Sequence, residues 1–177
     1  MAPLTTIPLL FFSTNATARH AFYFGFLQGM IAYGLSLYWF TNIFKSGAIV
    51  LYAILSLFTG IFCLLLNTTN KKIQSHILKA LFAAVCWTAL EFFRSELFWL
   101  RFTWITPGTA IGPTWLSPFI GVYGASFIII FSATLTVFKH TRIIGIVFCI
   151  LTLFLGIIDL PVVVPQQNTI NVAAVQS

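Results

Sequence analysis

Charge is the scarcest feature of this sequence. Only 7% of its 177 residues are charged, whereas 59% are hydrophobic; soluble domains carry about 25% charged residues. Nine basic and three acidic side chains cannot form the polar shell that a soluble core of this size needs. The composition therefore excludes an ordinary soluble domain and predicts a surface that faces lipid.

Acidic residues are the rarest charged type, which leaves a net charge of +6. A basic protein can bind nucleic acid, but Lys and Arg stand here singly or in pairs between apolar runs and do not gather into one patch. No nucleic-acid partner is therefore expected.

Cysteine and histidine are also sparse. The cysteines lie inside apolar runs and are too far apart for a metal or redox motif, so we interpret them as small apolar residues. The histidines stand at the ends of apolar runs without a nearby carboxylate or cysteine, which favours an interfacial position over ligation. No metal and no cofactor are expected. These residues are Cys63, Cys86, Cys149, His20, His76 and His140.

Long apolar runs, in contrast, are abundant. A helix that rises 1.5 Å per residue needs about 20 residues to cross a hydrocarbon core about 30 Å thick. Runs that meet or approach this length predict an all-α polytopic membrane protein with about five transmembrane helices. The predicted spans lie near residues 21–40, 47–66, 77–93, 116–138 and 143–158, within a membrane domain over residues 21–160.

The fourth predicted span contains three residues that disturb a straight helix. Pro118, Gly121 and Gly124 all fall in its first turns. Lipid-embedded helices tolerate such residues where neighbouring helices satisfy the backbone. We therefore expect a bent or closely packed start.

The distribution of Lys and Arg predicts an orientation, because membrane insertion retains basic loops in the cytoplasm. With five spans, the connecting loops alternate between two sides. Residues 1–20, a cytoplasmic or interfacial segment, fall on the more basic side, so the C-terminus is expected outside. The two sides carry Arg19, Lys71, Lys72, Lys79, Lys139 and Arg142 against Lys45, Arg94 and Arg101.

Two segments depart from the helical pattern. The loop from Arg94 to Trp115 is rich in aromatics, glycine and proline, and we interpret it as an ordered outer cap, because irregular backbone near lipid must be buried or line a wet cavity. Residues 161–168 have the composition of a linker, and Thr169–Gln176 has the pattern of a buried strand. One strand is unstable alone, so it either pairs with another molecule or begins a further domain.

The stretch CWTALEFFRSELFWLRFTW, residues 86–104, resembles a segment of the apolipoprotein N-acyltransferase family. In that family a Trp is followed by Glu, two apolar residues, Arg and then a Gly-Phe-Pro-Trp loop. The matching residues are Trp87, Glu91, Arg94, Phe102 and Trp104, while Arg101 and Thr103 replace the Gly and the Pro of the loop.

Three further segments follow in the family's order. GFLQGMIAYGLSLYWF, residues 25–40, is similar to the family's Gly-rich helix that ends in Tyr-Trp. LSPFIGVYGASFIII, residues 116–130, is similar to its Leu-x-Pro-x-x-Gly-x-x-Gly-x-Ser-Phe span. INVAAVQ, residues 170–176, resembles the first strand of the nitrilase-like domain that the family carries outside the inner membrane.

The resemblance implies the membrane portion of a bacterial inner-membrane enzyme, with the N-terminus cytoplasmic and the C-terminus periplasmic. Such an enzyme transfers an acyl chain from a phospholipid to the N-terminal diacylglyceryl-cysteine of a lipoprotein. Its Glu–Lys–Cys triad is expected beyond Ser177, so no catalytic residue is expected in these 177 residues, which alone would be inactive. The implied partners are the phospholipid donor, the apolipoprotein acceptor, membrane lipids and a nitrilase-like domain, which could be a separate polypeptide.

Five residues are candidates for the site. Glu91 and Arg94 are three apart on a helix, so a same-face ion pair is favoured over a role in shaping a substrate cavity and orienting lipid headgroups. Trp39, Trp99 and Trp104 fall on the outer side, where interfacial anchoring is favoured over lining the path of an acyl chain.

Two other functions remain open. A non-catalytic membrane scaffold or binding subunit would use the strand-like segment to hold a partner. A small transporter would need an inverted repeat and charges at mid-membrane; the sequence shows neither pattern, because Glu91 lies near the end of a predicted span.

Overall fold

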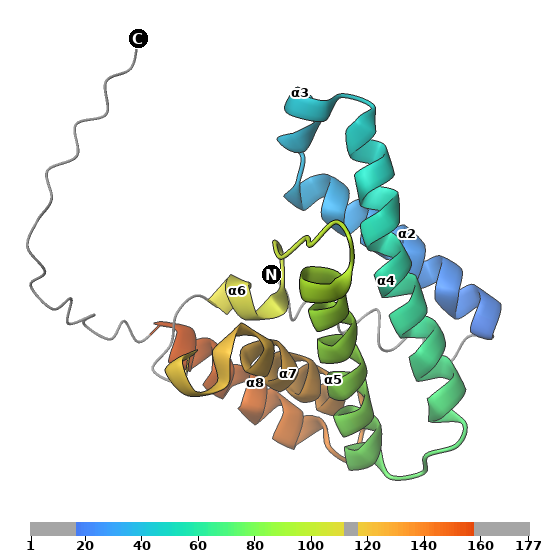
Figure 1. Cartoon of the computed structure of the whole chain (residues 1–177). Helices are drawn as coiled ribbons and strands as arrows, with labels where there is room; N and C mark the ends of the chain where they lie inside the picture. The colour runs from blue at the N-terminus through green and yellow to red at the C-terminus, as the bar shows by residue number, and fades with distance from the viewer. Residues whose placement is uncertain (1–16, 112–116, 158–177) are drawn as a thin grey trace, which may run out of the picture.

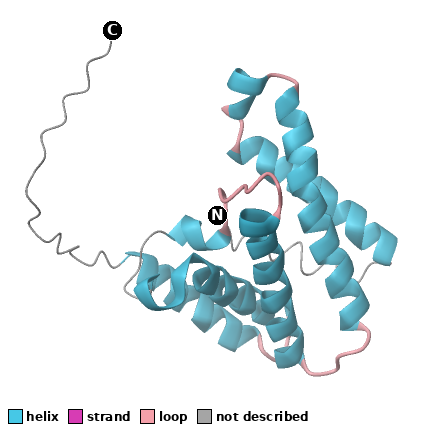
Figure 2. Cartoon of the chain, viewed as in Figure 1, coloured by secondary structure: helices cyan, strands magenta, loops and turns pink. Residues whose placement is uncertain are grey.

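The structure is a computed structural model that describes residues 17–111 and 117–157 (Figure 1). Of these residues 82% are helical, and no strand occurs among them (Figure 2). The prediction of an all-α membrane protein is therefore confirmed. The predicted strand at residues 169–176, Trp115 and most of the N-terminal segment lie outside the described residues.

The predicted spans coincide with helices. Three of them, Gly47–Asn70, His76–Leu97 and Ser117–Val137, are long and apolar enough to cross a membrane. The first predicted span is divided, because its helix ends at Ser36 and a turn separates it from a short helix that begins at Phe40. Crossing by the first and last helices stays a prediction. The helices are α2 (Ala18–Ser36), α3 (Phe40–Phe44), α4 (Gly47–Asn70), α5 (His76–Phe92), the π-helix η1 (Phe93–Leu97), α6 (Pro107–Ile111), α7 (Ser117–Val137) and α8 (Arg142–Ile157).

Helix α2 packs closely along α4 through two glycines one turn apart. A Cβ atom on Gly25 would lie 2.6 Å from Cys63 Sγ, and one on Gly29 would overlap the Thr59 side chain. The Thr59 hydroxyl donates a hydrogen bond of 2.9 Å to the Gly25 carbonyl oxygen. Small residues at this spacing allow the close approach that drives association of helices in lipid.

The opposite face of α2 carries large apolar side chains at intervals of four residues. Their exposed fractions range from 57% to 77%. A helix that faced water would not expose a continuous row of such large apolar side chains. This stripe is the surface expected of a helix that faces lipid. The residues are Tyr23, Leu27, Ile31 and Leu35.

Helices α5, α7 and α8 form the second group. α7 packs between α5 and α8, and α5 contacts α7 through alanine side chains. The two groups meet where Phe62 of α4 packs edge-to-face on Trp87 of α5, with 4.9 Å between ring centroids. The core thus lies between α4 and α5, where α2 and α7 cover it from either side.

The start of α7 is bent, as predicted. Gly121 adopts φ 63°, ψ −174°, a conformation that interrupts the helix and that only glycine takes readily. The bend turns the first residues of α7 relative to the long remainder of the helix.

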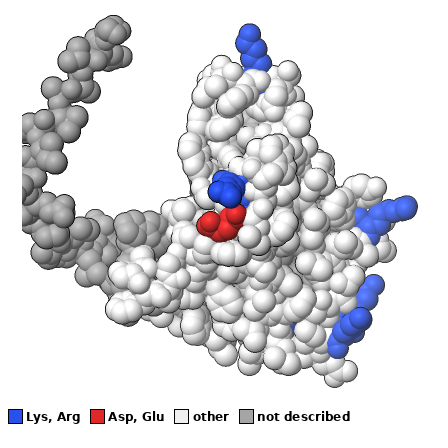
Figure 3. Space-filling model, in the orientation of Figure 1, with Lys and Arg blue, Asp and Glu red and all other residues white. Residues whose placement is uncertain are grey.

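The start of α5 lies against the turn between α7 and α8. The His76 ring stacks 4.8 Å from Phe138 and 5.7 Å from His140, and Lys79 Nζ lies 5.5 Å from the Phe138 ring centroid. Basic residues of both connections therefore gather at the His76 end of α5. Figure 3 shows basic atoms at several places along the edge of this face, and a basic group beside acidic atoms near its centre.

Candidate functional site

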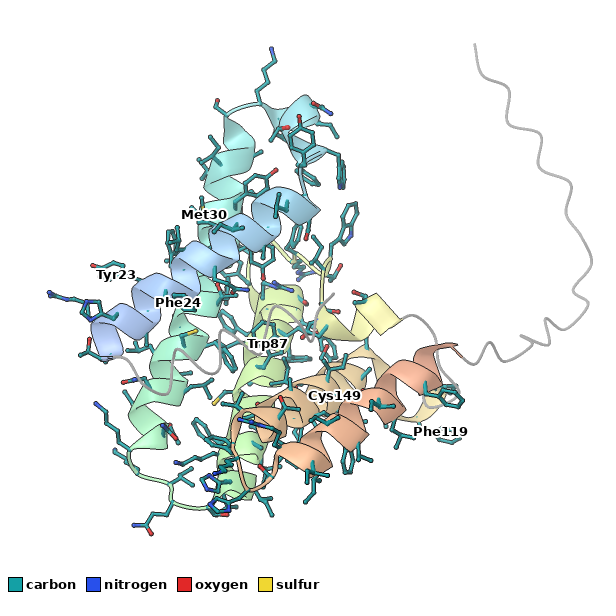
Figure 4. The ribbon with its side chains drawn as sticks, turned by 180° about the vertical axis from the view of Figure 1, so that it is seen from behind. Tyr23, Phe24, Met30, Trp87, Phe119 and Cys149 are labelled. Carbon is teal, nitrogen blue, oxygen red and sulfur yellow. The ribbon has the colours of Figure 1, made fainter. Side chains whose placement is uncertain are left out.

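The opposite end of α5 holds a buried carboxylate. Glu91 is 4% exposed, in the last turn of the helix. Trp87 Nε1, one turn earlier, donates to its Oε2 at 2.9 Å, and the Ser126 hydroxyl of α7 donates to its Oε1 at 2.8 Å. Figure 4 shows Trp87 in the middle of the bundle. Both oxygens are therefore satisfied, as a carboxylate buried in an apolar bundle requires.

The Ser126 hydroxyl extends this network to the loop. Its oxygen accepts a hydrogen bond of 2.9 Å from the backbone N–H of Gly108, in the first turn of α6. A Cβ atom on Gly108 would lie 3.0 Å from Ser126 Oγ and would overlap the Val122 carbonyl. Only glycine lets α6 approach α7 so closely. We name the series of hydrogen bonds that joins Glu91, Ser126 and the Gly108 amide the Glu91 relay. It attaches the loop that holds α6 to α5 and α7.

Arg94 is buried as deeply as Glu91 but faces another helix. It is 4% exposed, and its Nη1 donates to the Tyr33 hydroxyl of α2 at 2.7 Å. The guanidinium carbon lies 5.9 Å from the centroid of the same ring. Arg94 thereby links the end of α5 to α2, between the two groups of helices.

A small cavity lies beside this link. It has a volume of about 20 Å³, and its lining includes Tyr33, Thr59, Glu91 and Arg94. Within the described residues the buried Nε of Arg94 has no hydrogen-bond partner. The cavity has room for one water, which needs about 10–15 Å³, next to polar groups that could bind it.

The predicted ion pair between Glu91 and Arg94 is wrong. No carboxylate oxygen of Glu91 lies within 4.0 Å of a guanidinium nitrogen of Arg94; the carboxylate binds α5 and α7, and the guanidinium binds α2. The cause lies in the backbone, because α5 widens into the π-helix η1 after Phe92, and the N–H of Phe98 donates to the Phe93 carbonyl at 2.7 Å. π-turns of this kind are frequent at functional sites.

The candidate tryptophans divide into two groups. The rings of Trp39 and Trp104 lie 5.5 Å apart, and Phe40 and Phe102 pack around them. This aromatic cluster joins the α2–α3 connection to the loop after η1. Trp99 lies outside the cluster and is 74% exposed, so anchoring at an interface is the simpler role for it.

The described part of the loop after η1, residues 98–111, includes the short helix α6. Two of its residues hold left-handed backbone, Arg101 at φ 43° and Ile105 at φ 58°. Arg101 stands where the motif that this stretch resembles has Gly. Its left-handed backbone conformation is one that Gly adopts more readily than Arg does. A groove of about 550 Å³, with Trp104 and Tyr123 in its walls, opens beside this loop.

Sequence reasoning missed the partners that complete the site. Tyr33 and Ser126 are 61 and 35 residues away from the charged residues that they bind. The pairing of Trp87 with Glu91 was detectable, because residues four apart on a helix are neighbours. Ser126 also stood out as a hydroxyl inside an apolar run, but its partner could not be read from the sequence.

The site offers buried hydrogen bonds and an aromatic surface, but the described residues hold no group of three or more His, Cys, Asp or Glu that could bind a metal. All three cysteines lie within apolar helices. The arrangement can therefore hold the loop and the groove beside it in place.

One comparison with known proteins identifies a family. The profile of the apolipoprotein N-acyltransferase N-terminal domain matches residues 1–135. No curated protein and no solved structure matches the chain.

Proposed function

Because the chain belongs to the apolipoprotein N-acyltransferase N-terminal domain family, we propose that it is the membrane portion of an enzyme that matures lipoproteins. The enzyme takes an acyl chain from a phospholipid and transfers it to the N-terminal diacylglyceryl-cysteine of a lipoprotein. In this proposal the membrane portion holds the donor and the acceptor beneath a nitrilase-like domain.

One observation carries the proposal beyond family membership. Residues that match the family's motif meet near the Phe92 end of α5, although the motif extends over 18 positions. Trp87 donates to Glu91, and the rings of Phe102 and Trp104 lie 6.3 Å apart. Arg94 lines the same small cavity as Trp87 and Glu91. Three motif residues therefore border one small cavity and two more pair as aromatic rings, and this grouping supports a working face more than simple lipid anchoring does.

In this proposal the nitrilase-like domain catalyses the acyl transfer. Acyl transfer through a thioester needs a thiolate next to a base, and Cys63, Cys86 and Cys149 lie within apolar helices. Residues 1–177 would then be inactive alone, and the Glu–Lys–Cys triad would be supplied in the same or a separate polypeptide.

The orientation follows the basic residues. The contacts of His76 with Phe138 and His140 bring two basic connections to one end of the bundle, and basic loops stay in the cytoplasm. This supports an inner-membrane protein with its N-terminus in the cytoplasm, its C-terminus in the periplasm, and the Glu91 relay on the periplasmic side.

Reconstitution tests the function. The chain, joined to or mixed with a nitrilase-like domain in phospholipid vesicles, is given a diacylated peptide with a free N-terminus, and mass spectrometry measures the added acyl chain. The account predicts triacylated peptide only when both parts are present. Transfer by the nitrilase-like domain without the chain would contradict it, and stable binding without any transfer would favour the scaffold function.

A further inference from the structure

Positive charge gathers at the His76 end of α5. The α4–α5 and α7–α8 connections, with the helix turns next to them, carry five basic residues. The acidic residues of the described chain, Glu91 and Glu96, lie in the last turn of α5 and in η1, so no described carboxylate neutralises the His76 end. The five basic residues are Lys71, Lys72, Lys79, Lys139 and Arg142.

The folded structure positions part of this charge. The ring centroids of His76 and Phe138 lie 4.8 Å apart, and Lys79 Nζ lies 5.5 Å from the centroid of the same Phe138 ring. Arg142 Nε donates a hydrogen bond of 3.2 Å to the Thr136 carbonyl oxygen, which holds the guanidinium at the end of α7. Cations that are held in place lose less conformational entropy when they bind an anion.

A small cavity lies beside Lys79, where the ends of α4 and α7 meet the start of α5. Its volume is about 20 Å³, which is room for one water-sized group and not for a whole headgroup. The lining contains one charged side chain, Lys79, and is otherwise mostly apolar. A charged group at the rim of an apolar depression suits an amphiphilic ligand whose polar head stays outside. The apolar lining consists of Leu66, Phe82, Val137 and Phe138.

We propose that the His76 end binds the phosphate of an anionic phospholipid, with Lys79 as its central ion partner and the four other basic residues around it. The first acyl carbons lie against Leu66, Phe82 and Val137. Basic pockets between transmembrane helices are known to bind anionic headgroups. The inference takes only its leaflet, the cytoplasmic one, from the proposed function, and it concerns neither the donor nor the acceptor of the acyl transfer.

The surroundings of Lys79 favour a lipid over a soluble anion. Ile77 and Leu78, which precede it on α5, are 57% and 53% exposed. A soluble anion would use the charges but leave these apolar side chains uncovered. A phospholipid covers both, because its phosphate lies at the level of the lysine and its acyl chains lie beside the helix. A zwitterionic lipid gains less, because its own cation meets the same positive surface.

Native mass spectrometry of the full chain tests the preference. The chain is released from nanodiscs that contain equal amounts of phosphatidylglycerol and phosphatidylcholine with identical acyl chains, and the lipids that stay bound are counted. The wild-type chain should retain phosphatidylglycerol about tenfold over phosphatidylcholine, the size expected of one or two basic residues at an anionic surface. A ratio near one would overturn the proposal.

Two matched variants separate this site from the net charge of the chain. Lys79→Gln removes the central charge and should lower the ratio of the two lipids to about threefold. Lys45→Gln makes the same change at an exposed lysine after α3 and should leave the ratio at its wild-type value. Equal ratios in the two variants would show that net charge alone attracts the lipid, and would overturn the site.

Two further variants guard against a loss of structure. Phe138→Leu keeps all five charges but removes the ring on which His76 and Lys79 pack, and should give a ratio between those of the wild type and Lys79→Gln. Circular dichroism compares the helical content of every variant. If Lys79→Gln loses helix, the exposed pair Lys71→Gln with Lys72→Gln replaces it, and an unchanged ratio there would overturn the proposal.

The last arms identify the occupant and keep this inference apart from the proposed function. Glycerol phosphate, which carries the phosphate without acyl chains, should not displace the bound phosphatidylglycerol; displacement would assign the site to a soluble anion and overturn the lipid assignment. Acyl transfer in the reconstituted enzyme reports on the proposed function alone. Normal transfer with an unchanged lipid ratio in Lys79→Gln would remove this inference and leave the function standing. A tenfold ratio in a wild-type chain that supports no transfer would do the reverse.

Discussion

The two ends of helix α5 place their polar side chains in different environments. At the His76 end, the His76 ring stacks on Phe138 and His140, and Lys79 Nζ lies over the Phe138 ring. At the Phe92 end, where α5 passes into η1, Glu91 and Arg94 are both 4% exposed and each binds a specific partner on another helix. Long basic side chains reach the interface at low cost, whereas buried charges are expensive and tend to be functional. The difference supports our proposal that the working face lies at the Phe92 end of α5.

The largest effect that tests this comparison is loss of the buried carboxylate. Glu91→Ala removes the acceptor of both Trp87 Nε1 and the Ser126 hydroxyl, and should lower the free energy of unfolding by about 3 kcal/mol. Unfolding of the chain in mixed micelles by increasing sodium dodecyl sulfate measures this. Equal losses in Glu91→Ala and in Lys79→Ala at the other end would break the comparison.

The hydroxyl in the middle of the relay comes next. Ser126→Ala leaves the Gly108 amide and one Glu91 oxygen without partners and should cost about 2 kcal/mol. Ser132→Ala is the matched control, because Ser132 is equally buried but its hydroxyl donates only to Ile128 of its own helix; its cost should stay below about 0.5 kcal/mol. Hydrogen exchange at the Gly108 amide should accelerate in the first variant and not in the second.

The link from Arg94 to α2 should be weaker. Tyr33→Phe removes the hydroxyl that accepts from Arg94 but keeps the ring beneath the guanidinium, so we expect a loss of about 1 kcal/mol. Tyr38→Phe, 70% exposed in the turn that follows α2, should change stability by less than about 0.3 kcal/mol. An equal loss of stability in Tyr38→Phe and Tyr33→Phe would show that the hydrogen bond from Arg94 does not cause the loss.

The smallest effect is expected at the His76 end. Lys79→Ala removes a cation–π contact with Phe138 near the surface, worth at most about 0.5 kcal/mol. The same micelle titration measures it. A loss above 2 kcal/mol would mean that this end is as tightly built as the other.

The positions of the helices along the sequence were largely predictable, because apolar runs of sufficient length mark them. The bend at Gly121 was predictable as well, since glycine and proline marked it. The division of the first span was missed, because residues 37–39 are apolar or aromatic and give no local sign that α2 ends at Ser36.

The candidate site was predictable in its residues but not in its connections. The motif singled out Glu91 and Arg94, and their spacing suggested an ion pair. The π-turn of η1 is not visible in a sequence, and neither are Tyr33 and Ser126 as partners from distant helices. Pairing between helices in lipid depends on packing, which local patterns do not encode.

The account is tested most directly by the rate of acyl transfer in the reconstituted enzyme with substitutions at the two ends of α5. The rates of Glu91→Ala and Lys79→Ala are compared with wild type at equal amounts of folded chain. The account predicts at least a tenfold loss for Glu91→Ala and less than a twofold change for Lys79→Ala. Equal rates in both variants, or transfer that does not need the chain, would contradict it.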